Sequence, residues 1–184
     1  TRYIAVTGVQ TCALPISGSV SISHSDNRDG VDLENDGAFR IDGSRRFRDF
    51  SDGTSNSVVA SEVLAGPDKV YDGSDWDTRG MWGIHHMGAF CYTHRNSPNA
   101  SAGDVIWRSS SYRRCIEGLK GMPCDPTSTS EWDTLHAAAR SKHPGGVNVA
   151  FADGHVGFVP ETVNLVLWQA TGAIDDSQVI SVDF

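Results

Sequence analysis

Seven histidines are the residues with which this chain could most readily bind a metal ion or transfer a proton. His85 and His86 are adjacent, and neighbouring side chains on a strand point to opposite faces, which makes a shared metal ion awkward. His94 could join one of them, but no further carboxylate or cysteine stands at a recognised zinc spacing. A metal-dependent hydrolase built on these histidines is therefore the weakest function that we weigh. We predict no catalytic residue, no metal and no cofactor.

His143 and Asp153 form a second candidate, because a carboxylate can orient the imidazole of a general base. Residues 147–151 alternate as in a strand with one buried face, and Asp153-Gly154 is typical of a tight hairpin turn. A strand of this length, at about 3.3 Å per residue, would separate its ends by roughly 16 Å. We therefore expect both residues to be structural, each bonding backbone groups at its own end of the hairpin.

Other elements must surround this hairpin to give it a core. Val156 and Phe158 resume the alternation within the returning strand, residues 155–159. Residues 57–64 hold an apolar, β-branched run and are the best upstream strand. The 3.6-residue spacing of apolar side chains within 163–170 predicts a C-terminal helix whose stripe lies on the sheet. That stripe comprises Val163, Val166, Leu167 and Ala170.

Weaker patterns predict further elements and complete the fold class. They are strands at 37–41 and 81–84, a helical turn within 45–50, and a short helix at 131–140. Together these patterns predict an α+β fold, in which an antiparallel sheet is covered by a C-terminal helix and long loops.

Composition narrows the class of partner. The chain has a formal net charge of −8, and this acidic balance argues against nucleic acid, which needs clustered lysine and arginine. Hydrophobic residues make up 39% of the chain and glycine is frequent, with 19 residues, which favours a turn-rich β-containing domain over a helical bundle. No apolar run approaches the roughly 20 residues of a membrane span.

The N-terminal segment resembles a translated sequencing-library adapter across residues 6–16. We therefore expect residues 1–16 to be a non-native segment that makes few contacts. Residues 17–36 are polar and predict a linker, and residues 37–184 form a single globular domain on this interpretation.

Two motifs carry a resemblance to a known family. The first is Asp52-Gly53-Thr54-Ser55-Asn56, which leads into a strand that contains Glu62. The second is His143-Pro144-Gly145-Gly146, with nine residues between His143 and Asp153-Gly154. With the tail from residue 163, they resemble a large bacterial family with prepilin-type N termini, abundant in planctomycetes and catalogued as domain of unknown function 1559. The resemblance covers most of the chain after about residue 37.

This resemblance implies the globular head of an exported, pseudopilin-like protein that is structural or interactive rather than enzymatic. It implies an extracytoplasmic location at the cell envelope or surface, with other cell-surface or pilin-like proteins as partners. Family members begin with a leader and a long apolar helix, which would lie upstream of a junction near Ser17 and would make the only membrane contact.

Besides the metal-dependent hydrolase, one further function stays open as an alternative to this interpretation. An extracytoplasmic binding module could hold a glycan or small solute in the long loop 85–130, with aromatic side chains as stacking surfaces. These aromatics are Trp82, Tyr92, Trp107 and Tyr112.

Cys115 and Cys124 bracket a short loop that a disulfide could close if the protein is exported, and free thiols, including Cys91, are the alternative.

Overall fold

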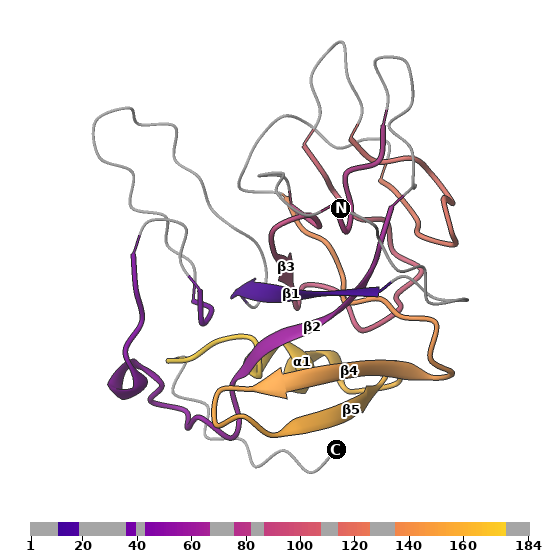
Figure 1. Cartoon of the computed structure of the whole chain (residues 1–184). Helices are drawn as coiled ribbons and strands as arrows, with labels where there is room; N and C mark the ends of the chain where they lie inside the picture. The colour runs from indigo at the N-terminus through magenta and orange to yellow at the C-terminus, as the bar shows by residue number, and fades with distance from the viewer. Residues whose placement is uncertain are drawn as a thin grey trace, which may run out of the picture.

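The computed structural model of the protein describes residues 11–18, 36–39, 43–66, 76–81, 87–107, 114–125 and 135–175. Within these ranges the strands form a five-stranded sheet in the order β3-β1-β2-β4-β5 (Figure 1). Its strands are β1 (Thr11–Gly18), β2 (Val58–Leu64), β3 (Tyr92–Thr93), β4 (Gly146–Phe151) and β5 (Val156–Pro160). A short helix α1 (Leu165–Ala170) and a 3-10 turn η1 (Phe47–Asp49) accompany the sheet. The α+β class is confirmed, but the sheet is mixed, because β1 and β3 run parallel.

The predicted hairpin is present. β4 and β5 pair antiparallel from Gly146 opposite Pro160 to Ala150 opposite Val156, about a turn in which Gly154 has φ 94°. Val147, Val149 and Phe151 of β4 face the core, as expected. β5 lies one residue later than the predicted strand 155–159, and in it Val159 is buried whereas Val156 and Phe158 are exposed. The register explains this difference, because Val156 and Phe158 lie opposite Ala150 and Asn148, on the face of the sheet away from the core.

β2 lies at the centre of the sheet and begins one residue after its predicted start. It pairs antiparallel with β1 on one side and with β4 on the other. Val58, Ser61 and Val63 are buried, and the Ser61 hydroxyl donates to the Asn148 carbonyl at 3.1 Å. Glu62 therefore points to the opposite face, since side chains alternate along a strand.

The expectation that residues 1–16 make few contacts is wrong for residues 11–16. They form most of β1, paired with β2 from Thr11 opposite Leu64 to Pro15 opposite Ala60. Leu14 is 1% and Ile16 0% exposed, and both belong to the main core cluster. The prediction rested on the resemblance of the segment to an adapter and did not consider the alternation of its apolar side chains, which lets it complete the sheet. Residues 1–10 and most of the expected linker, 19–35, lie outside the described residues.

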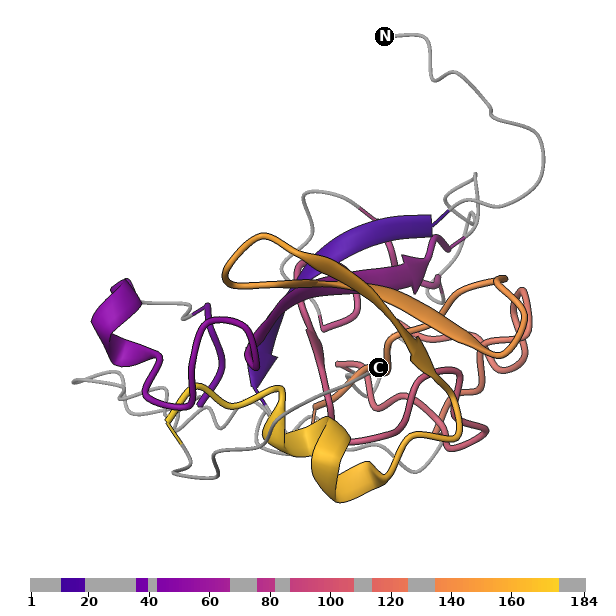
Figure 2. The ribbon, with the colours of Figure 1, turned by 90° about the horizontal axis from the view of Figure 1, so that it is seen from below.

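Helix α1 lies against one face of the sheet, as expected, but it presents a different side (Figure 2). The Asn164 side chain caps the helix by accepting from the backbone N–H groups of Val166 and Leu167, so the helix begins at Leu165. Trp168 and Ala170 are buried, whereas Val166, a member of the predicted stripe, is 63% exposed. Of the other stripe members, Ala170 is buried and Val163 packs against the main core cluster, so the prediction is wrong for Val166. No helix among the described residues is long and apolar enough to cross a membrane.

The helix predicted at 131–140 is wrong where the structure describes it. Residues 135–140 form no helix and are all buried, and residues 131–134 lie outside the description. Their backbone bonds to other segments: His136 pairs with Val105, and the Arg140 N–H donates to the Glu62 carbonyl at 2.9 Å. Tertiary hydrogen bonds thus override the helical propensity of this alanine-rich stretch.

The remaining predicted elements have mixed outcomes. The helical turn within 45–50 is confirmed as η1. Residues 37–39 are bends and coil rather than a strand, and residues 40–42 lie outside the description. Of the strand expected at 81–84, only Met81 is described, and it belongs to no strand.

Candidate functional site

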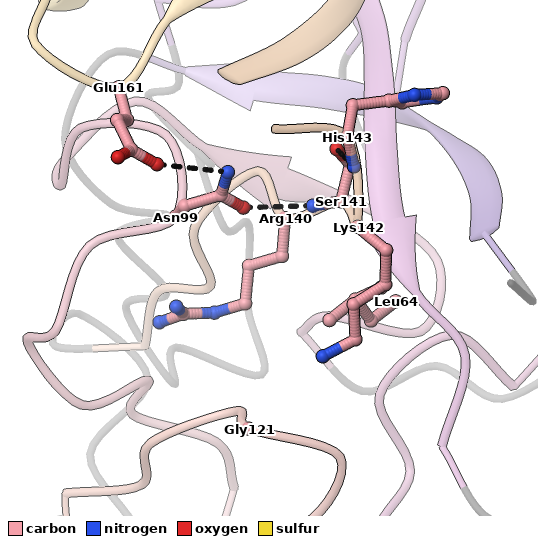
Figure 3. Close-up of a pocket in the computed structure, with 8 residues that line it drawn as sticks. All are labelled: Leu64, Asn99, Gly121, Arg140, Ser141, Lys142, His143 and Glu161. Carbon is pink, nitrogen blue, oxygen red and sulfur yellow. Dashed lines mark hydrogen bonds between the residues drawn. The ribbon is translucent and has the colours of Figure 1, made fainter. Parts of the chain in front are cut away.

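A cavity of about 290 Å³ opens beside the start of β4 (Figure 3). Its lining comes from the end of β2, the loop after β3, the loop closed by a disulfide, the segment before β4, and the residue after β5. The lining residues are Leu64, Asn99, Gly121, Arg140, Ser141, Lys142, His143 and Glu161. Polar and charged side chains dominate this set, so the cavity suits a polar molecule rather than a lipid or an apolar ligand.

Arg140 forms the fixed wall of the cavity. Its guanidinium holds the buried carboxylate of Asp104, with Nη2 2.8 Å from Oδ1 and Nε 3.2 Å from Oδ2. Nη1 donates to the Ala100 carbonyl at 2.6 Å, and Nη2 also donates to the Ala102 carbonyl at 3.1 Å. Because four donor contacts fix the group, Arg140 can shape the cavity without moving when a ligand enters.

A second buried arginine extends this ionic network away from the cavity. Arg79 lies between Asp77 and Asp104, with Nη2 2.6 Å from Asp77 Oδ2 and Nη1 2.8 Å from Asp104 Oδ2. Burial alone would lower the pKa of Arg79, but the hydrogen bonds and charges of the two carboxylates outweigh it and raise that pKa. Arg79 also donates to the carbonyls of Ile116 and Pro123, so the network anchors the loop on which one side of the cavity rests.

That loop is closed by a disulfide between Cys115 and Cys124, as the sequence allowed. Cys91 is buried and is not part of a disulfide. Gly121, within the loop, has φ 83°, and a Cβ added there would come within 3.4 Å of Lys142 Nζ. The positive φ favours glycine at this position, and any side chain there would contact the Lys142 amine at the cavity.

Asn99 and Ser141 join the walls of the cavity by hydrogen bonds (Figure 3). Asn99 Oδ1 accepts from the Ser141 N–H at 2.9 Å, and Asn99 Nδ2 donates to Glu161 Oε2 at 3.4 Å. The Ser141 hydroxyl donates to the Gly146 carbonyl at 2.8 Å and accepts from the His143 N–H at 2.9 Å. These hydrogen bonds hold the segment that precedes β4 in place before any ligand binds.

His143 contacts a carboxylate that the sequence did not assign to it. Its Nε2 lies 3.1 Å from Oε1 of Glu62, and the His143 side chain is about half exposed. Glu62 Oε2 accepts from the backbone N–H of Asn148 at 2.9 Å and from its side-chain amide at 3.3 Å. The expectation that His143 bonds backbone groups is wrong for its ring, because Glu62 on the neighbouring strand is nearer. Two family-motif residues distant in sequence are therefore brought together.

Asp153 does not pair with His143. Its Oδ1 accepts from the backbone N–H of His155 at 3.0 Å and lies 2.6 Å from His155 Nδ1. The backbone hydrogen bond from His155, followed by that from its ring, lowers the pKa of Asp153. Since His143 precedes β4 and Asp153 follows it, the two lie at opposite ends of the strand, as predicted.

The first motif forms a turn that touches the hairpin turn. Asn56 Nδ2 donates to the Asp52 carbonyl at 2.9 Å, and the Ser57 hydroxyl donates to the Gly53 carbonyl at 3.1 Å. The Asp153 N–H donates to the Thr54 carbonyl at 3.1 Å. The two motifs thus meet through their backbones at the end of the sheet opposite His143.

His94 is a core residue, whereas His85 and His86 lie outside the described residues. The His94 ring stacks on Trp168 with 3.4 Å between ring centroids. Its Nδ1 lies 2.6 Å from the Trp168 carbonyl, which can only accept, so Nδ1 donates and Nε2 accepts from the Tyr92 hydroxyl at 3.0 Å. Burial lowers the pKa of His94 to about 3, although the bond to Trp168 acts in the opposite direction. No cluster of three metal-binding side chains occurs among the described residues.

Of the four aromatic residues proposed as stacking surfaces, the structure describes two, and neither lines the cavity. Tyr92 is fully buried, and Trp107 packs against the second core cluster. Trp82 and Tyr112 lie outside the description. The cavity takes Asn99 and Gly121 from the long loop 85–130, and His143 from the second motif. Arg140, Lys142 and Glu161 were not predicted from the sequence, because they come to line one cavity only when the fold brings their segments together.

Comparison with known proteins gives one match. The model of a family named SBP_bac_10, described as a protein of unknown function (DUF1559), matches residues 8–165. No curated protein and no solved structure matches the chain. The matched range contains both motifs and β1, and it confirms the resemblance drawn from the motifs.

Proposed function

This chain belongs to the DUF1559 family of proteins of unknown function, and we propose that it is a non-enzymatic, exported, pseudopilin-like component of a cell surface or secretion apparatus. On this proposal the described domain is a globular head, and the complete protein carries an N-terminal prepilin helix ahead of it. The head presents a surface to other pilin-like subunits and transforms no substrate.

The observation that supports this proposal best is that the motif residues form hydrogen bonds that hold turns and strands of the fold together. Asn56 braces its own turn, Glu62 joins β2 to β4, and the carboxylate of Asp153 closes the hairpin turn. Catalytic motifs bring reactive side chains together at a cavity. Here His143 lines the cavity, but Glu62 and Asp153 accept from backbone N–H groups at opposite ends of β4, as residues that maintain a fold do.

The disulfide supports the exported location. Cys115 and Cys124 close a loop whose carbonyl groups accept from the buried guanidinium of Arg79. Structural disulfides form and persist in oxidising compartments and are rare in the cytosol of most organisms.

The edge of β5 supplies a surface for a pilin-like partner. β5 is the last strand in the sheet order, so one side of its backbone has no neighbouring strand among the described residues. Val156 and Phe158 are 68% and 41% exposed on this strand. An edge strand with exposed apolar side chains favours association with another protein.

Photo-crosslinking in the native cells tests this proposal. Phe158 of the complete protein is replaced by p-benzoylphenylalanine, and the adducts formed under light are identified by mass spectrometry. Phe47, which is 78% exposed on η1, receives the same replacement as a matched control. We expect a pilin-like subunit among the adducts from position 158 only. The proposal fails if position 158 gives no adduct, or only the adducts that position 47 gives.

A further inference from the structure

We propose that the cavity beside β4 binds a small zwitterion of the α-amino acid class, with its carboxylate at Lys142 and its ammonium group at Glu161. This site goes beyond the proposed role in assembly and does not depend on it. Three properties of the cavity lead to this ligand: the placement of its two charges, the fixed wall between them, and its size.

The first property is a pair of opposite charges that do not neutralise each other. Lys142 Nζ donates to the Lys120 carbonyl at 2.7 Å, and Glu161 accepts from the Asn99 amide at 3.4 Å. Neither forms an ion pair with another residue in the described ranges. Figure 3 draws them on different sides of the cavity, with Asn99 and Ser141 between them. A ligand with one charge of each sign could satisfy both.

The second property is that the wall between these charges is already ordered. Arg140 is held by Asp104, which also binds Arg79, and Arg79 binds Asp77 in turn. Two buried arginines are therefore balanced by two buried carboxylates. Arg140 therefore contributes little net charge to the cavity, and Lys142 remains the cation to which a carboxylate would bind. A site held by such contacts loses little conformational freedom when a ligand binds.

The third property is the size and shape of the space. A volume of about 290 Å³ is at the lower end of small-molecule sites, which suits a compact ligand. Leu64 adds one apolar contact on the side of Lys142, and Gly121 keeps the approach to the Lys142 amine open. These dimensions favour an amino acid over an oligosaccharide or a folded partner.

Nuclear magnetic resonance titration with three probes tests this inference. L-Alanine carries both charges, propionate carries only the carboxylate, and ethylamine carries only the ammonium group. We expect saturable shifts of the Asn99, Ser141 and Lys142 amides, with L-alanine binding at least tenfold more tightly than either analogue. The inference is overturned if the shifts do not saturate, or if the three probes bind equally.

Two charge-removing variants assign the ends of the ligand. In Lys142→Gln, L-alanine should bind no more tightly than ethylamine, because only the ammonium contact remains. In Glu161→Gln, it should bind no more tightly than propionate. Arg48→Gln and Asp175→Asn change the net charge equally at exposed positions outside the cavity and should leave binding within twofold of the unmodified protein. Equal weakening by these controls, or unchanged binding in both cavity variants, would contradict the site.

Discussion

Glu62 joins the two family motifs: its Oε1 lies 3.1 Å from His143 Nε2, while its Oε2 accepts from the Asn148 N–H at 2.9 Å. The His143 side chain in the first contact is half exposed, whereas the second contact is partly buried and lies next to the Ser61–Val149 pair of β2 and β4. Glu62 therefore has a structural role that does not depend on any reaction of His143.

This arrangement predicts unequal effects of two substitutions. Glu62→Ala should lower the free energy of unfolding by about 1–3 kcal/mol, because a partly buried N–H loses its acceptor. His143→Ala should cost less than about 1 kcal/mol, since a half-exposed contact between a histidine and a carboxylate contributes little. Urea unfolding of both variants measures the two effects. A larger loss for His143→Ala would show that His143, and not the backbone of Asn148, is the more important partner of Glu62.

The hairpin turn predicts a second contrast. Asp153→Asn keeps an oxygen that can accept from the His155 N–H and should change the midpoint of thermal unfolding little. Gly154→Val should destabilise the protein by about 1–3 kcal/mol or more, because φ 94° is strained for a β-branched residue. Gly157→Ala on β5, where glycine has no positive φ, is the control. Equal melting curves for Gly154→Val and the unmodified protein would be incompatible with this turn.

Some of these features could be predicted from sequence because their causes are local. Alternation about Asp153-Gly154 predicted the hairpin, and the apolar run after Asn56 predicted β2. The helix face could not be predicted from spacing alone. Asn164 determines where α1 begins, and the stacking of Trp168 on His94 determines which side is buried.

The ionic network had no local signal. Asp77, Asp104 and Arg140 are far apart in the sequence, and only the packing of three extended segments brings them together. The cavity depends on the same packing, which explains why Lys142 and Glu161 were not identified from the sequence. β1 was missed for a different reason, because its residues were judged by a resemblance to adapter sequence rather than by their alternation.

The position of β1 in the sheet predicts that substitutions in it destabilise the protein, whereas the sequence had suggested that this segment contributes little to stability. Leu14→Ala and Ile16→Ala should each cost about 2–5 kcal/mol, because both side chains are fully buried against the core. Ala13→Ser, on the exposed side of the same strand, is the matched control and should cost little. Chemical unfolding measures the three changes. Losses below about 1 kcal/mol for both core variants would mean that β1 is not part of the stable sheet.

His94 predicts the slope of stability at acid pH. Because its pKa falls to about 3 in the folded protein from an ordinary value near 6.5, only the unfolded chain takes up this proton between those values. Stability should therefore fall as pH decreases from about 6 to 4, and His94 should contribute up to about 1.4 kcal/mol per pH unit to the slope.

His94→Gln removes this titration while keeping hydrogen-bonding capacity. Its absolute stability should be lower, since the stack with Trp168 is lost, but its stability should depend less steeply on pH across this range. Urea unfolding at pH 6, 5 and 4 supplies both slopes. Parallel slopes for the two proteins would indicate that His94 is not buried in its neutral form.

Protease accessibility of the complete protein in its native cells tests the exported, pseudopilin-like assignment most directly. Spheroplasts are treated with protease, and the described domain and a cytoplasmic marker are followed by immunoblotting. We predict that the domain is degraded while the marker stays intact, because an exported head lies outside the cytoplasmic membrane. Protection of the domain until the spheroplasts are lysed would contradict the assignment.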